Sequence, residues 1–337
     1  MTRAPHHYRP AGNEPLFQLT GRGKAAVPVF DKRAGLLSAA LISVAMLGAG
    51  CGSSSDGDAA TPSSGASGST GVSVVASTNV YGDIVRQIAG DKATITSIIS
   101  DPSADPHSYE ANTRTQLELS KADLVIENGG GYDDFVDTML KAADSDAKVL
   151  NAVEISGKAA TGGEELNEHV WYDLPSMGKL ADQIVGALST AAPDDAATFT
   201  ANATTFKQKL KDLEATAGEI KAAHGGAGVA ITEPVPGYLL DACGLVNKTP
   251  EEFSEAIEEG TDVSAGTLNE TLALFTRKQV KLLAYNEQTT GPETEKVLQA
   301  AKDNTVGVVP VTETLPAGKD YVSWMSGNLA AVKTALG

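Results

Sequence analysis

From residue 72 onward, short apolar runs alternate with stretches in which apolar residues recur every three or four positions. A short apolar run bounded by turn-forming residues predicts a strand, and the longer spacing predicts an amphipathic helix. The expected strands of the first part are 72–78, 94–100, 123–128 and 147–155, and its expected helices are 82–89, 112–122, 133–143 and 176–190. Strands that alternate with helices predict an α/β lobe over residues 72–192.

A second series of the same kind predicts a second α/β lobe over residues 226–337. Its expected strands are 228–232, 280–285 and 306–311, and its expected helices are 237–243, 265–277, 293–301 and 321–336. Between the lobes, residues 193–225 place Phe206, Leu210, Leu213, Ala217 and Ile220 on one helical face. One long helix should therefore join the lobes. A coiled-coil dimerisation helix is the alternative, but the pattern covers only about two heptads, so we expect a monomer.

The start of the chain has the pattern of an export signal. Lys32 and Arg33 precede the apolar segment 34–50, which ends in small residues before Cys51. This order predicts a signal peptide over 1–50 with a long basic region, and a short membrane span is the alternative. Residues 48–51 (GAGC) resemble a bacterial lipobox, although Leu47 lies four positions before the cysteine instead of three. We expect Cys51 to be lipidated and residues 51–71, rich in Gly, Ser and Ala, to form a flexible tether.

Charge and cysteine content narrow the function further. Residues 1–50 carry six basic and two acidic residues, so their removal takes the formal net charge from −17 to −21. Such an acidic protein repels phosphate backbones, which argues against nucleic-acid binding and is compatible with attracting cations. If Cys51 carries lipid, Cys243 has no partner for an intramolecular disulfide, and its apolar surroundings predict a small buried side chain.

After removal of the signal peptide the protein contains three histidines, and two of them lie in matching positions. His107 lies in a proline-stiffened loop after an expected strand, and His169 lies in a loop that leads into an expected helix. Open α/β sheets bind ligands at the edge where such loops meet. His224 lies at the end of the long helix, where the helix dipole favours an imidazolium, so we expect a structural role for it.

Several short motifs together resemble one family. Residues 105–110 (DPHSYE) are similar to a D-P-H-x-Y-E motif, and residues 169–173 (HVWYD) to an H-x-W-x-D motif. Residues 285–288, 313–316 and 321–324 are similar to a C-terminal pattern of one subgroup. From Val72 to Leu336 the chain thus resembles the periplasmic or lipoprotein receptors of zinc and manganese ABC transporters. The resemblance implies two α/β lobes bridged by one long helix, a metal site in the cleft between them, and a membrane permease with its ATPase as partners.

The resemblance also implies the ligands. His107 and His169 would bind the ion from the first lobe, and Glu233, directly after an expected strand, from the second. For the fourth ligand we expect Glu287, with Glu293 or a water molecule as alternatives. Imidazole nitrogen and carboxylate oxygen suit Zn²⁺ and Mn²⁺ as the transported ligand, whereas the scarcity of cysteine argues against copper(I). The residues expected to orient the imidazoles are Asp105, Glu110 and Asp173.

Two other classes of function use similar residues. A zinc hydrolase also combines two histidines with a glutamate, but the sequence has no H-E-x-x-H motif, nucleophile elbow, phosphate-binding loop or dinucleotide fingerprint. We therefore expect no enzyme activity. A receptor for a small organic ligand, or an adhesin as some relatives have been described, is the other alternative. Organic-ligand cavities usually display several aromatic side chains, and only 5% of the residues here are aromatic.

Overall fold

The structure is a computed structural model that describes residues 71–103, 106–160 and 165–337. The predicted signal peptide, Cys51 and all but the last residue of the predicted tether lie outside the described residues. Among the described helices, none combines the length and the apolar character needed to cross a membrane.

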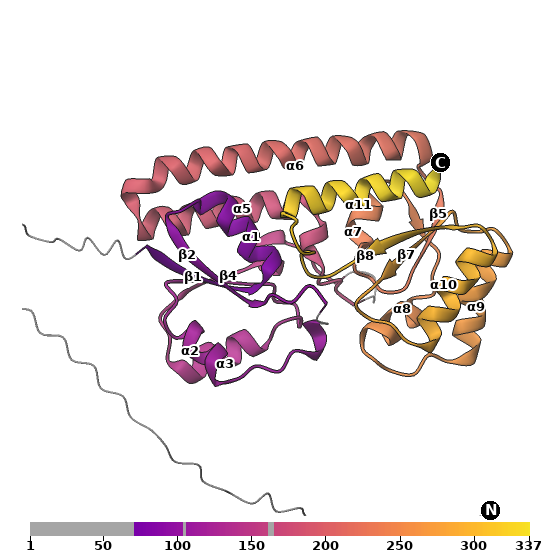
Figure 1. The fold of residues 1–337 in the computed structure, drawn as a ribbon, viewed down its shortest axis with the longest axis horizontal. Helices are drawn as coiled ribbons and strands as arrows, with labels where there is room; N and C mark the ends of the chain where they lie inside the picture. The colour runs from indigo at the N-terminus through magenta and orange to yellow at the C-terminus, as the bar shows by residue number, and fades with distance from the viewer. Residues whose placement is uncertain (1–70, 104–105, 161–164) are drawn as a thin grey trace, which may run out of the picture. The chain divides into compact units, whose positions relative to one another are not determined.

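The first lobe is built on a four-stranded parallel sheet with strand order β2-β1-β3-β4 (Figure 1). The strands are β1 (Val72–Thr78), β2 (Ala93–Ile99), β3 (Leu124–Glu127) and β4 (Lys148–Asn151). The helices are α1 (Asn79–Ala89), α2 (Thr113–Leu119), α3 (Phe135–Ala143), α4 (Ala152–Ser156) and α5 (Leu174–Ala191). Because all four strands are parallel, their carboxyl ends meet at one edge.

Helices cover both faces of this sheet, as the near-continuous apolar strands require. Successive side chains of a strand point to opposite faces, and β1 shows the consequence. Val74 and Ala76 pack in one core with α1 and α5, whereas Val75 packs in a separate core with Leu119 of α2 and Val136 of α3. Figure 1 shows these two pairs of helices on opposite sides of the sheet.

The second lobe repeats the arrangement with strand order β6-β5-β7-β8, again all parallel. The strands are β5 (Gly228–Ile231), β6 (Val246–Asn247), β7 (Leu282–Asn286) and β8 (Gly307–Val311). The helices are α7 (Gly237–Ala242), α8 (Glu251–Glu258), α9 (Ala265–Thr276), α10 (Pro292–Asp303) and α11 (Tyr321–Leu336). The prediction of two α/β lobes is confirmed.

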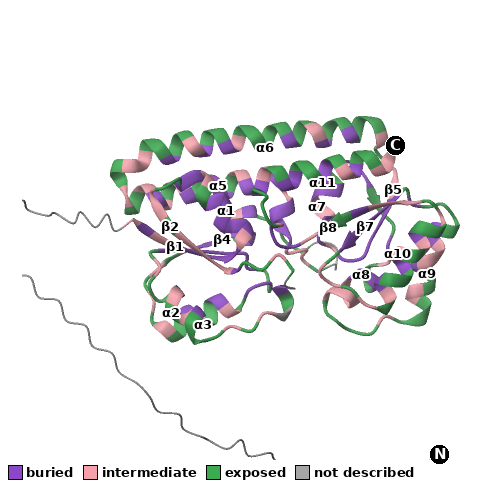
Figure 2. Ribbon diagram, in the orientation of Figure 1, coloured by how far each residue is buried: buried purple, intermediate pink, exposed green. Residues whose placement is uncertain are grey.

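The long helix α6 (Ala196–His224) runs along both lobes. It packs against α1 and α5 of the first lobe and against α7 and α11 of the second. Its buried face, a stripe in Figure 2, consists of Phe199, Ala203, Phe206, Leu210, Leu213, Ala217 and Ile220. The apolar residues whose spacing predicted a linking helix therefore form the face that α6 buries against both lobes.

A second segment also ties the lobes together. Residues 312–321, between β8 and α11, pass along the first lobe. Tyr172 Oη donates to the carbonyl of Thr312 at 2.7 Å, and the Leu315 N–H donates to Asn79 Oδ1 at 2.8 Å. Tyr321 Oη donates to the carbonyl of Trp171 at 2.6 Å. These bonds fix the second lobe to the first, so α6 is not the sole connection between the lobes among the described residues.

Two local predictions were wrong. The expected strand 147–155 ends at Asn151, whose side chain accepts a hydrogen bond from the Glu154 N–H and caps α4. The sequence analysis also missed β6 and α8. Helix α8 has glutamate at four of its eight positions, and its burial depends on Phe253 packing against α9 and α10. Phe253 and Ile257, four positions apart, therefore hold α8 to the core of the second lobe.

Candidate metal centre

His107 lies on a single 3₁₀ turn, Pro106–Ser108, that follows β2. Its Nε2 atom is 3.4 Å from Glu313 Oε2 and 3.9 Å from Glu258 Oε1. The imidazole meets the ring of Tyr132 edge-on, with 5.0 Å between ring centroids. The first predicted ligand is therefore brought against two carboxylates of the second lobe.

His169 is completely buried beside His107. Asn167 Oδ1 lies 2.9 Å from His169 Nδ1, and because an amide oxygen only accepts, Nδ1 carries the proton. Nε2 then has a lone pair, and it has no hydrogen-bond partner among the described residues. It faces Glu258 Oε1 at 3.3 Å and Glu313 Oε2 at 3.9 Å. This tautomer is the one that binds a metal ion through Nε2.

Asn167 also links His169 to the second lobe. Its Nδ2 donates to the carbonyl of Pro234 at 2.9 Å, and its own carbonyl accepts a bond from Tyr238 Oη at 2.6 Å. Gly237 leaves room for this contact, because a Cβ there would lie 2.8 Å from Asn167 Nδ2. One asparagine thus fixes the imidazole and touches the segment that follows Glu233.

Glu313 follows β8 and is fully buried. Tyr132 Oη donates to its Oε2 at 3.2 Å, and Asn286 Nδ2 donates to its Oε1 at 3.0 Å. Its backbone N–H donates to Gln288 Oε1. These bonds hold the Glu313 carboxylate toward the two imidazoles.

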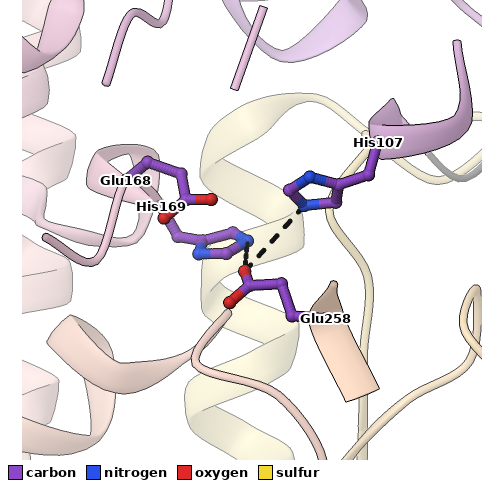
Figure 3. Close-up of side chains that lie close together, drawn as sticks. All are labelled: His107, Glu168, His169 and Glu258. Carbon is purple, nitrogen blue, oxygen red and sulfur yellow. Dashed lines mark ion pairs between the residues drawn. The ribbon is translucent and has the colours of Figure 1, made fainter. Parts of the chain in front are cut away.

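Glu258, the last residue of α8, comes from a different direction. Among the described residues, ligand atoms of His107, Glu168, His169 and Glu258 all lie within 4.8 Å of one another (Figure 3). The Glu258 side chain is 12% exposed, and its Oε1 has no hydrogen-bond partner among the described residues. Figure 3 shows this carboxylate between the two imidazoles.

Glu233, predicted as the third ligand, lies in the same carboxylate group. It lies two residues after the end of β5 and is 2% exposed. Asn286 Nδ2 donates to Glu233 Oε2 as well as to Glu313, so one amide group bridges the two carboxylates. Glu233 Oε1 has no hydrogen-bond partner among the described residues.

The structure does not bring Glu287 to this group. Its side chain is exposed, and its backbone N–H pairs with the carbonyl of Val311 in the sheet. Because side chains alternate along a strand, Asn286 faces the carboxylates and Glu287 points away. Glu293, the alternative, lies on α10 with Lys296 Nζ 3.7 Å away. Glu313, two residues after the neighbouring strand β8, is the carboxylate that shares the Asn286 amide with Glu233.

One of the predicted orienting residues has another partner in the structure. Asp173 caps α5 by accepting from the Ser176 N–H, and Glu110 is exposed. Asp105 lies outside the described residues. The residue that orients His169 is Asn167, two positions earlier. Asn167 belongs to the same loop as the H-x-W-x-D motif. Its side-chain amide, which can hydrogen-bond an imidazole, was the signal in the sequence that could have identified it.

The crowding of acidic groups shifts their proton affinity. Burial raises the pKa of Glu233 to about 7, and burial together with Glu168 raises the pKa of Glu258 well above its usual range. Burial lowers the pKa of His169 well below its usual value, with a contribution from His107, so its imidazole is neutral at pH 7.

His107 shifts in the opposite direction. Burial alone lowers its pKa, but the neighbouring carboxylates, led by Glu313, outweigh burial and raise that pKa to about 9. A divalent cation would replace this proton and those on the carboxyl groups as the balancing positive charge.

The donor spacing fits a metal ion. In a tetrahedral site with bonds of about 2.1 Å, donor atoms lie about 3.4 Å apart. The distances from each Nε2 atom to the Glu258 and Glu313 oxygens run from 3.3 to 3.9 Å. Two nitrogens and several carboxylate oxygens form a donor set that suits zinc and manganese.

Comparisons with known proteins identify the family of the chain. The model of the family described as zinc-uptake complex component A, periplasmic, matches residues 74–335. The manganese-binding lipoprotein MntA of Bacillus subtilis (strain 168) is 27% identical over 278 residues, covering 80% of this chain and 86% of that protein. The zinc-binding lipoprotein AdcA of Streptococcus pneumoniae (strain ATCC BAA-255 / R6) is 23% identical over 272 residues, covering 74% of this chain and 53% of that protein.

The fold has close counterparts among solved structures. The periplasmic zinc-binding protein TroA from Treponema pallidum superposes with a TM-score of 0.68 at 19% identity, covering 79% of this chain and 99% of that one. Identity at this level shows a shared fold alone. The matching region spans about half the length of several of the curated relatives.

Proposed function

The chain belongs to the zinc-uptake complex component A family, and we propose that it captures a divalent transition metal, zinc or manganese, for an ABC importer. It would act as the substrate-binding component outside the cytoplasm and deliver the ion to a membrane permease whose ATPase powers transport. The observation that carries the proposal is the meeting of His107 and His169 with buried carboxylates of the other lobe.

The proposed ligands divide between the lobes. His107 and His169 supply nitrogen from the first, and Glu313 supplies oxygen from the second at 3.4 Å from His107 Nε2. Glu233 stays our proposal for a further ligand, supported by its buried, unpartnered Oε1 and by the amide group it shares with Glu313. Glu287 is not retained as a candidate, because its side chain is exposed.

The function as a receptor, not a hydrolase, is supported by the same donors. A catalytic zinc keeps a coordination position open for water or substrate. Here the two imidazoles, Glu313 and Glu233 together offer enough donor atoms for a closed tetrahedral shell. The names of the relatives, a manganese-binding and a zinc-binding lipoprotein, support the same class of ligand.

We propose the location from the sequence and the relatives. Cys51 would carry lipid and residues 51–71 would tether the lobes to the extracytoplasmic face of the cell membrane. The naming of MntA and AdcA as lipoproteins supports an anchor of this kind. We propose further that the protein is a monomer, since α6 buries its apolar stripe within the chain.

Elemental analysis of the purified protein tests the proposal, with zinc and manganese in competition. We expect about one equivalent of metal, lost in the His107→Ala, His169→Ala double variant. His224→Ala serves as the matched control, because His224 ends α6 away from the site. Absence of bound zinc and manganese from the unmodified protein would overturn the proposal and direct the search to organic ligands.

A further inference from the structure

A cavity of about 1140 Å³ lies beside the candidate metal centre, between elements of the two lobes. This volume far exceeds that of a bare ion. Carboxylates from both lobes line it: Glu165 and Glu168 from the first, and Glu251, Glu255, Glu258 and Glu259 from the second. The cavity therefore connects the centre to an acidic space large enough for a hydrated cation.

The lining divides the centre into two sides. His107, Glu168 and Glu258 contribute to the cavity wall. His169 and Glu313 are fully buried and do not line it. An ion that reached the inner residues through this cavity would pass Glu258 on the way.

Glu258 is placed to bind that ion. Its Oε1 lies 3.3 Å from His169 Nε2 and 3.9 Å from His107 Nε2, close to the donor spacing of a metal site. His169 Nε2 is itself completely buried and without a hydrogen-bond partner among the described residues, and it faces Glu258. This buried lone pair is an observation independent of the acidic cluster, and it points to a ligand between the two side chains.

Apart from His107, the cavity wall has little positive charge to offset its carboxylates. Lys158 is the single lysine or arginine among the described residues that line it. Its Nζ lies 3.1 Å from Asp173 and 4.4 Å above the ring of Tyr238. Because Asp173 already pairs with this ammonium group, the wall keeps a negative potential, and a cleft of one charge sign concentrates ions of the opposite sign.

We propose that Glu258 is a metal ligand on the entrance side of the centre and that the acidic cavity is the path by which a hydrated divalent cation enters and leaves. The proposal rests on the proposed function as a metal receptor. It gives Glu258, on α8, a position toward the cavity that the buried ligands do not share. His107, His169, Glu233 and Glu313 are the four ligands already proposed, and Glu258 would be a fifth, bound on the side of the ion that faces the cavity.

The ligand role is tested by the dissociation rate of Zn²⁺ and of Mn²⁺ from the full chain, followed after mixing with excess chelator. Glu258→Gln should release both ions at least about tenfold faster, since even residues that only support metal ligands change affinity by roughly 10–100-fold. Glu252→Gln is the matched control, because Glu252 lies on the same helix, is exposed and does not line the cavity. It should release the ions at the unmodified rate.

Should Glu258→Gln fail to fold, Glu258→Asp keeps the charge and shortens the side chain by one methylene. It should also accelerate release. Equal dissociation rates for the unmodified protein and for the folded Glu258 variant would overturn the ligand role. Co²⁺ gives a second readout, because its visible absorption should change in the Glu258 variant and stay the same in Glu252→Gln.

The entry path is tested by the association rate at low and high salt. The Glu251→Gln, Glu255→Gln double variant should bind more slowly at low salt, with the difference shrinking as salt screens the charges. Its dissociation rate should not change. Association that is as fast as in the unmodified protein at low salt would rule out this path.

The two levels of the proposal fail differently. If the unmodified protein and Glu252→Gln bind neither ion, the proposed function is wrong. If both bind and the Glu258 variant behaves like them, the receptor function stands and the entrance ligand is wrong.

Discussion

The two lobes contribute chemically different halves of the proposed metal centre. In the first lobe, Asn167 holds His169 as a neutral imidazole before any ion arrives. In the second, Glu233 and Glu313 share one amide donor, Asn286, and burial keeps the pKa of Glu233 raised. His169 is thus held by a neutral amide, whereas the carboxylates, although also hydrogen-bonded, depend on protons or a cation to offset their mutual repulsion. The ion should stabilise the second lobe's half of the centre most.

The pH dependence of binding should be the largest effect, because it acts on both halves. His107, with its pKa raised to about 9, holds a proton throughout pH 5 to 8, and the ion must displace it. Glu233, at about 7, adds a second proton toward the acid end. One displaced proton changes affinity tenfold per pH unit, so affinity should fall about a thousandfold or more from pH 8 to 5. Calorimetry in buffers of different ionisation enthalpy would count the released protons, and a flat profile would contradict the histidine ligands.

Loss of a carboxylate ligand should come next. Glu313→Gln removes the charge beside both imidazoles and should weaken Zn²⁺ and Mn²⁺ binding by about a hundredfold or more. The matched control is Glu287→Gln, the exposed glutamate one strand away, which should bind as the unmodified protein does. Competition with a chelating dye measures both. If Glu287→Gln weakened metal binding and Glu313→Gln did not, Glu287 would again be the candidate for the fourth ligand.

Removal of the Asn167 side chain, which holds the His169 imidazole, should have a smaller effect on metal affinity. Asn167→Ala leaves all ligands in place but frees His169 Nδ1, so affinity should drop roughly tenfold while the stoichiometry stays at one ion. Asn202→Ala, which removes an amide that donates only to the Ile88 carbonyl in the described structure, is the control. Unchanged affinity in Asn167→Ala would show that the imidazole needs no such support.

Movement of the lobes should be the smallest effect. Helix α6 packs on both lobes, and the Leu315 and Tyr321 contacts fix the second lobe to the first. We therefore expect solution scattering to show a change in radius of gyration below roughly 1 Å when metal is added. A large compaction would contradict this and would mean that the contacts of residues 312–321 break.

Much of the fold followed from local patterns. The strands of a parallel sheet are apolar throughout, and the face of α6 repeats every three or four residues, so both leave a clear signal. Helix α8 left only a short signal, because Phe253 and Ile257, four positions apart, stand among four glutamates in a helix of eight residues. The end of β4 was misplaced because Asn151, whose side chain caps α4, lies inside an apolar run and does not interrupt its pattern.

Only some residues of the proposed metal centre could be predicted from the sequence, for a related reason. His107 and His169 each lie in a short motif, and Glu233 directly follows a strand. Glu258 and Glu313 come from segments that meet the histidines only after both lobes have folded, and no spacing along the chain reveals that. Choosing Glu287 ignored the alternation of side chains at the end of β7, which turns Asn286 inward and Glu287 outward.

X-ray absorption spectroscopy of the zinc-loaded and manganese-loaded protein tests the central claim most directly, because it reports the atoms bound to the ion. The account predicts two imidazole nitrogens with the remaining ligands oxygen, and no sulfur, since Cys243 is buried apart from the site. In the His107→Ala, His169→Ala variant the imidazole signal should vanish. A sulfur ligand, or a shell without imidazole in the unmodified protein, would contradict a centre built from the nitrogens of one lobe and the carboxylates of the other.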